Sequence, residues 1–101
     1  MTQFIEVARL DEVPVGTGTT FHVGGKQVAV FNVAGTIYAI GDSCAHAGGS
    51  LGSGKLEGNV VTCRSHGMRY DVRTGEVTTG GLQVPAYPVK VIDGKIFIAP
   101  E

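Results

Sequence analysis

The sequence predicts an all-β protein, a small antiparallel sandwich or barrel. Short apolar runs fill most of the chain, and no segment sustains the 3.6-residue repeat of a helix. Sixteen glycines divide these runs, as is typical of short strands joined by tight turns. We expect one domain over residues 1–101, which is long enough to bury a core without disulfides.

The first half of the chain contains an edge strand and a hairpin. "FIEVARL" at 4–10 alternates weakly between apolar and polar residues, and "LDEVP" at 10–14 could form one helical turn. Two β-rich runs follow, Val28 to Val33 and Thr36 to Ile40. Only Ala34-Gly35 separates them, which predicts a tight turn between paired strands.

The second half predicts two further strands and a closing hairpin. "GNVVTC" at 58–63 and "MRYDV" at 68–72 have strand composition, and "RTGEV" at 73–77 predicts a turn followed by a short strand. "PVKVIDGKIFIA" at 88–99 gives the clearest hairpin, because Asp93-Gly94 supplies the positive backbone angles of a two-residue turn.

Composition and charge exclude several classes of protein. The net charge is −1 and there is no basic run, so nothing indicates binding to nucleic acid. The start of the chain lacks the pattern of a signal peptide, and no apolar segment is long enough to span a membrane. Two cysteines do not suggest a secreted disulfide scaffold, so we expect a cytoplasmic protein.

Cysteine and histidine occur in two tight pairs. Cys44 and His46 form C-x-H, and after sixteen residues Cys63 and His66 form C-x-x-H. Two such loops side by side would offer two thiolates and two imidazoles, a set that suits zinc or an iron–sulfur cluster. Glycines around both pairs would let the backbone turn sharply near a sulfur-rich anion. They are Gly48, Gly49, Gly52, Gly54 and Gly67.

The segment "CAHAGGSLGSGKLEGNVVTCRSHGMRYDVRTGEV" resembles the two cluster-binding loops of the Rieske family. The resemblance extends over the whole chain and is strongest to the small ferredoxins of ring-hydroxylating dioxygenase systems. It implies a Rieske-type β-sandwich whose cluster-binding subdomain is formed by two loops. It also implies one [2Fe-2S] cluster, with Cys44 and Cys63 on one iron and His46 and His66 on the other.

The resemblance implies a one-electron carrier that is not itself an enzyme. Such a protein takes electrons from a flavin-containing reductase and passes them to a terminal oxygenase, and we expect it to be a monomer. The contact surface for both partners would be the tip around the histidines, with Gly48, Arg64, Gly67 and Pro85. No nucleophile beside a base and no second metal motif argues for catalysis by this chain.

The chain departs from the family pattern at several positions. Many members have proline after each cysteine, where this chain has Ala45 and Arg64. High-potential members tie the two loops with a disulfide, but the matching positions here are Gly49 and Ser65. A tryptophan is common at the position of Met68, and high-potential members use a serine hydroxyl there. None of these departures removes a ligand.

These departures predict a low reduction potential. Fewer donors to the cluster stabilise its more negative reduced state less, so we expect roughly −150 mV rather than +300 mV. Tyr70 has the opposite effect, because it matches a tyrosine that donates to the sulfur of the first cysteine, here Cys44.

Three other interpretations remain open at this stage. The four residues could form a structural zinc site in a non-redox interaction module, or they could be unrelated core and surface groups. The chain could also resemble the small subunit of nitrite reductase, although relatives of that kind have lost their ligands. Isolated His22 is expected on a surface strand, and Phe31 and Tyr38 in the core. The carboxylates are expected to be solvated, namely Asp11, Glu12, Asp42, Glu57, Asp71 and Glu76.

Overall fold

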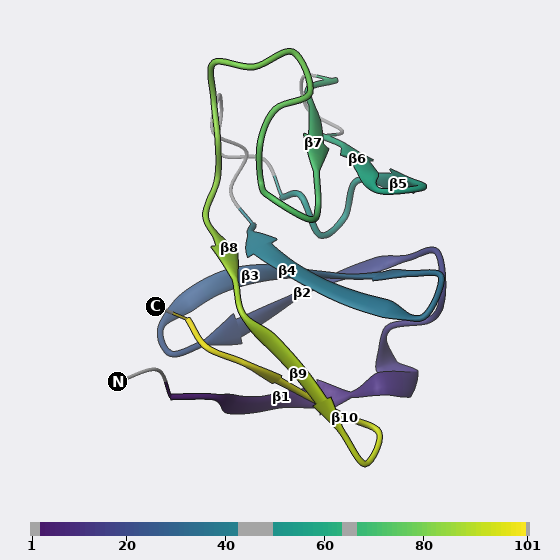
Figure 1. Cartoon of the computed structure of the whole chain (residues 1–101), viewed down its shortest axis with the longest axis vertical. Helices are drawn as coiled ribbons and strands as arrows, with labels where there is room; N and C mark the ends of the chain where they lie inside the picture. Colours follow the sequence, from purple (N-terminus) through teal and green to yellow (C-terminus); the bar gives the residue numbers. More distant parts are fainter. Residues whose placement is uncertain (1–2, 43–49, 64–66, 101) are drawn as a thin grey trace.

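The computed structural model describes residues 3–42, 50–63 and 67–100, whose strands form three antiparallel sheets (Figure 1). The first sheet has the order β1-β10-β9 and lies at the bottom of the view in Figure 1. It contains β1 (Ile5–Arg9), β9 (Val89–Ile92) and β10 (Lys95–Ile98). The 3-10 turn η1 (Leu10–Glu12) follows β1, as "LDEVP" predicted.

The second sheet is the middle layer and has the order β2-β3-β4-β8. Its strands are β2 (Gly18–Val23), β3 (Lys26–Val33), β4 (Thr36–Gly41) and β8 (Ala86–Tyr87). The third sheet, of order β5-β6-β7, lies at the top of Figure 1. It consists of β5 (Lys55–Glu57), β6 (Val60–Thr62) and β7 (Arg69–Asp71).

Both predicted hairpin turns are confirmed. Ala34 and Gly35 have φ angles of 52° and 96°, and they join β3 to β4. Asp93 and Gly94 have φ angles of 52° and 73°, and they join β9 to β10. Two consecutive positive φ angles give the turn a twist that matches the twist of the paired strands.

The middle sheet is buried on both faces, which explains its nearly continuous apolar run. Side chains alternate between the faces of a strand, so β3 sends Val28 and Val30 to one core and Ala29 and Phe31 to the other. The first core lies against the β1-β10-β9 sheet and includes Ile96. The second core lies against the β5-β6-β7 sheet, so the third sheet is fixed to the middle layer by apolar packing.

The structure differs from the sequence prediction after β7. The strand expected at the end of "RTGEV" is absent from the described residues, where Val77 and Glu76 form only isolated bridges to Tyr70 and Gln83. β2 was expected only as a surface strand at His22, without bounds. Two further strands that were not predicted, β5 and β8, are three and two residues long. Such short strands carry too few residues to show a period of two. In the described part of the chain, no helix is long and apolar enough to cross a membrane.

Candidate metal centre

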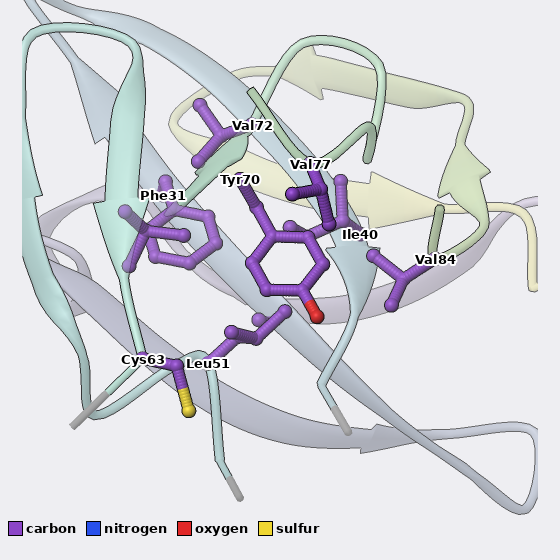
Figure 2. Close-up of a cluster of buried hydrophobic side chains, with 10 residues drawn as sticks. Phe31, Ile40, Leu51, Cys63, Tyr70, Val72, Val77 and Val84 are labelled. Atoms are coloured by element: carbon purple, nitrogen blue, oxygen red, sulfur yellow. The ribbon is translucent and has the colours of Figure 1, made fainter. Parts of the chain in front are cut away.

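Cys63 is the predicted ligand that lies in the described part of the chain. It follows β6, its side chain is 1% exposed, and its thiol is not in a disulfide. It belongs to the core between the middle and third sheets, together with Leu51 and Tyr70. Figure 2 shows its sulfur at the edge of this cluster, below Leu51 in that view.

Hydrogen bonds bring together the two ends of segment 64–66. The amide of Gly67 donates to the carbonyl oxygen of Cys63 over 2.8 Å, and the amide of Cys63 donates to the carbonyl oxygen of Met68, also over 2.8 Å. Gly67 has a φ of 70°, where glycine carries no steric penalty. The pairing continues into Thr62 opposite Arg69, so this closure extends the ladder between β6 and β7.

The two ends of segment 43–49 are also held together. The amide of Leu51 donates to the carbonyl oxygen of Asp42 over 2.7 Å, and the hydroxyl of Ser50 donates to Oδ1 of Asp42 over 3.0 Å. Just before this segment, the amide of Gly41 donates to the carbonyl oxygen of Pro85 over 2.8 Å. The segment containing the first cysteine and histidine therefore begins and ends at a fixed base.

One packed cluster supports both bases. Leu51 closes the first segment and Cys63 opens the second, and both side chains belong to the same buried core (Figure 2). Leu51 is fully buried, so this contact joins a residue from each loop through apolar packing. The predicted proximity of the two loops is thus supported at the residues that flank them.

Tyr70 lies at the centre of this cluster and is fully buried. In Figure 2 its hydroxyl points away from Val72 and ends beside Leu51. The acceptor that the resemblance implies for this hydroxyl is Cys44, which lies outside the described residues.

Five of the predicted site residues lie outside the described residues, namely Cys44, His46, Gly48, Arg64 and His66. Within the described ranges, no group of three or more His, Cys, Asp or Glu side chains could hold a metal ion. His22 lies on β2 as predicted, exposed and 3.1 Å from the side-chain nitrogen of Gln27.

Pro85 lies beside Gly41, at the base of the first loop. Its side chain is exposed, and it would be 3.0 Å from a Cβ placed on Gly41. Gly41 precedes the first cysteine by three positions, so Pro85 lies beside the start of the first loop.

The prediction that Asp42 is a solvated charge is wrong. Its side chain is 3% exposed and accepts three hydrogen bonds at Oδ1. Sequence gave little signal for this burial, apart from the position of Asp42 directly after a strong β-run. Asp71 is only partly exposed, and the neighbouring Arg73 guanidinium lowers the pKa of its carboxyl mainly by hydrogen bonding.

The described part of the site fits a thiolate-ligated cluster. Cys63 offers a buried, free sulfur at the edge of an apolar core, and an apolar shell restricts the access of solvent to such a centre. Cys44 and both histidines lie in segments 43–49 and 64–66, whose described ends this core supports. Together with Cys63 they would offer the mixed sulfur and nitrogen set of a Rieske cluster.

Comparisons with known proteins agree with this assignment. The model of the Rieske [2Fe-2S] domain matches residues 3–92. A ferredoxin component of naphthalene 1,2-dioxygenase/salicylate 5-hydroxylase systems from Ralstonia sp. is 36% identical, with all of both chains covered.

Two solved structures extend the likeness to the whole fold. The ferredoxin of carbazole 1,9a-dioxygenase from Nocardioides aromaticivorans has a TM-score of 0.93 and 36% identity, covering 99% of this chain and 100% of that one. A chain in a complex of reduced oxygenase and oxidized ferredoxin of carbazole 1,9a-dioxygenase has a TM-score of 0.88 and 29% identity. In that match, 100% of this chain and 96% of the other are covered. The chain belongs to the Rieske [2Fe-2S] family.

Proposed function

We propose that this chain is the ferredoxin of a multicomponent ring-hydroxylating oxygenase system. It carries one electron at a time from a flavin-containing reductase to a terminal oxygenase. The proposal is supported by the full-length similarity to ferredoxin components of dioxygenase systems and by the complex of an oxygenase with a ferredoxin of the same fold.

Cys44 and Cys63 would hold one iron, and His46 and His66 would hold the other. Bound in this way, a [2Fe-2S] cluster supplies a reversible one-electron couple, and its neutral imidazole ligands make reduction easier than in an all-cysteine centre. The buried Cys63 anchors its side of the site in the core. The single observation that carries the proposal is the match to the Rieske [2Fe-2S] domain over residues 3–92, and the core shared by Leu51 and Cys63 at the described ends of the two loops agrees with it.

The cavity next to Gly67 is not built as a catalytic site. This cavity beside the second loop has no carboxylate, imidazole or thiol in its lining, so it lacks a general base and a strong nucleophile. Its lining consists of Gly67, Met68, Arg69, Val77, Thr78 and Thr79.

The contact surface for both partners is proposed at the tip, with Gly48, Arg64, Gly67 and Pro85. Gly67 and Pro85 are exposed and small, so they let a partner approach the second loop and the base of the first closely. We further propose that the protein is a monomer and works in the reducing cytoplasm, where its thiolates stay available to iron.

The ligand assignment is tested on the purified protein by its visible spectrum, its electron paramagnetic resonance spectrum, and its iron and sulfide contents. The wild type is expected to be coloured with two irons and two sulfides per chain. Cys63→Ser and His66→Ala are expected to lose the native signal. His22→Ala, at an exposed histidine on β2, serves as the control and keeps it. A colourless protein that binds one zinc would contradict the proposal.

The contact surface is tested by electron-transfer kinetics with the reductase and the oxygenase. Arg64→Glu is expected to slow transfer to at least one partner without changing the spectrum of the cluster. Lys95→Glu is the matched charge reversal, because Lys95 is exposed on the β1-β10-β9 sheet, at the opposite end of Figure 1 from the β5-β6-β7 sheet. Equal rates for Arg64→Glu and the wild type with both partners would place the contact surface elsewhere.

A further inference from the structure

We propose that Asp42 is a positioning residue whose Oδ1 atom fastens the base of the first ligand loop. The inference rests on the proposed function, because it takes segment 43–49 to supply Cys44 and His46 as ligands. Asp42 is the last described residue before this segment, and Ser50 is the first described residue after it.

Three donors converge on the single oxygen Oδ1 of Asp42. The Thr20 hydroxyl donates over 2.8 Å, the Ser50 hydroxyl over 3.0 Å and the Gly52 amide over 2.8 Å. The two hydroxyl oxygens also lie 3.2 Å apart, and with both hydrogens directed at Oδ1 neither donates to the other. We call these four residues, Thr20, Asp42, Ser50 and Gly52, the carboxylate clasp.

The clasp joins segments that are distant in the sequence. Thr20 belongs to β2, Asp42 follows β4, and Ser50 and Gly52 follow the first loop. The backbone amide of Asp42 also donates to the carbonyl oxygen of Gln27 on β3, over 3.2 Å. Both ends of the loop are thereby fixed to the middle sheet, and not only to each other.

Burial makes these hydrogen bonds strong. Asp42 is 3% exposed, and a buried carboxylate is costly unless donors surround it. Hydrogen bonds to a charged acceptor are about twice as strong as neutral ones. Removing this acceptor would also leave the donor groups of Thr20, Ser50 and Gly52 with no carboxylate to bind. They lie in a region that water reaches poorly, so the loss is costly.

Gly52 shows how closely the parts of the clasp pack. A Cβ on Gly52 would overlap the Thr20 hydroxyl and lie 2.9 Å from the Thr20 backbone nitrogen. The absence of a side chain therefore lets the chain after the loop pass directly beside β2, where its amide reaches Asp42.

Fixed loop ends favour retention of the metal. A ligand that dissociates from iron rebinds quickly when its loop cannot spread, because little conformational entropy is gained on opening. Loss of the clasp frees the two ends and makes each dissociation harder to reverse. The expected effect is faster release of iron from a protein that is still folded.

The test compares Asp42→Ala with Asp42→Asn in the cluster-loaded protein. Iron release to a chelator is followed well below the unfolding temperature, with far-ultraviolet circular dichroism to monitor the fold. Asp42→Ala is expected to release iron roughly tenfold faster or more, and to broaden the electron paramagnetic resonance signal. Asp42→Asn keeps an Oδ1 acceptor and is expected to stay within about threefold of the wild type. Equal acceleration by both variants would overturn the role of the acceptor.

Asn32→Ala provides a matched control away from the loops. Asn32 is 4% exposed, donates to the carbonyl oxygen of Val13 over 2.8 Å and accepts from the amide of Gly35 over 2.9 Å. Its loss is expected to lower Tm while iron release from the folded protein stays unchanged. If Asp42→Ala releases iron no faster than Asn32→Ala, the clasp has no positioning role.

Two milder variants keep the proposal testable if Asp42→Ala does not fold. Thr20→Val and Ser50→Ala each remove one donor and are expected to accelerate release by roughly threefold each. If neither variant releases iron faster than the wild type, the proposal is overturned. A native resonance signal in His46→Ala would instead refute the ligand assignment, whatever the clasp variants do.

Discussion

Gly67 donates its backbone amide to the carbonyl oxygen of Cys63 over 2.8 Å, and it does so at a φ of 70°. The second ligand loop therefore ends at a residue in the left-handed region. Among the described residues, a Cβ on Gly67 would meet no atom within 4 Å, so backbone conformation is the constraint that the described structure places on side chains there.

Gly67→Val is expected to destabilise the protein, because a β-branched residue is strained at positive φ. A cost of about 1–2 kcal/mol corresponds to a Tm lower by roughly 5 °C or more in a chain of this size. Gly67→Asn is the control, since asparagine tolerates this region. Thermal unfolding followed by circular dichroism measures both. Equal Tm values for the two variants would contradict the argument.

Tyr70→Phe is expected to lower the reduction potential of the cluster. A donor near the ligand sulfur stabilises the more negative reduced state, so losing it makes reduction harder. A difference of about 1 kcal/mol between the two oxidation states corresponds to roughly 40 mV for one electron. Protein-film voltammetry measures the shift. Tyr38→Phe, at a half-buried tyrosine beside the same core, is expected to leave the potential unchanged. An unshifted potential in Tyr70→Phe would mean that its hydroxyl does not act on the cluster.

The ion pair of Asp71 and Arg73 predicts a small dependence of stability on pH. Arg73 donates from Nη2 to Oδ2 over 2.8 Å and from Nε to Oδ1 over 3.1 Å, which lowers the pKa of Asp71. A lowered pKa in the folded state adds stability above the unfolded pKa of about 3.9. That stability is lost as the pH falls through the folded value.

Asp71→Asn is therefore expected to lower Tm at neutral pH by roughly 2–4 °C, in keeping with a partly exposed pair. The difference from the wild type is expected to hold down to about pH 5 and to shrink below about pH 4. Thermal unfolding between pH 3 and pH 8 measures it. A difference that grows on acidification would have the wrong sign.

Substitutions at Gly75 and Gly80 distinguish the cost of a strained backbone from the cost of a steric collision. Both have a φ of 82°, but a Cβ on Gly75 would collide with the carbonyl oxygen of Val84, while one on Gly80 would meet nothing within 4 Å. The amide of Val84 donates to the carbonyl oxygen of Gly75 over 2.8 Å. This close approach holds in place the segment between β7 and β8, residues 72–85, which we call the strap.

Gly80→Ala is expected to cost about 1 kcal/mol, the ordinary cost of alanine at positive φ. Gly75→Ala adds the collision and is expected to cost at least about 2 kcal/mol more, a lowering of Tm by well over 5 °C. Thermal unfolding of the two variants side by side tests the difference. Equal losses would show that the strap shifts freely to admit the added methyl group.

Local patterns in the sequence were enough to predict two of the hairpins, but the β2–β3 hairpin at Gly24-Gly25 was missed. Ala34-Gly35 and Asp93-Gly94 each lie between β-rich runs, and only a two-residue turn with positive φ fits that spacing. The apolar run of β3 also predicted a strand, and its burial on both faces follows from the cores on either side.

The environment of Asp42 could not be predicted because its partners are far apart in the sequence. Thr20 is 22 residues away and Ser50 is eight. The contact with Thr20 forms only after β2 and β4 have both paired with β3, the strand that lies between them. The motif residues were chosen from their spacing alone, and the family match supports that choice. Neither pattern nor spacing indicates which carboxylate is buried.

The chain leaves the middle sheet at the end of β4 and returns to it at β8, and these two strands are neighbours. Ala39 pairs with Tyr87 and Ile40 pairs with Ala86, so the described chain between Gly41 and Pro85 leaves the sheet and re-enters it at adjacent strands (Figure 1). Leu51, Cys63 and Tyr70 from this part share one buried core with Phe31 and Ile40 of the middle sheet. A substitution in this core that tunes the redox centre therefore also changes the stability of the fold, so the two properties are constrained to evolve together.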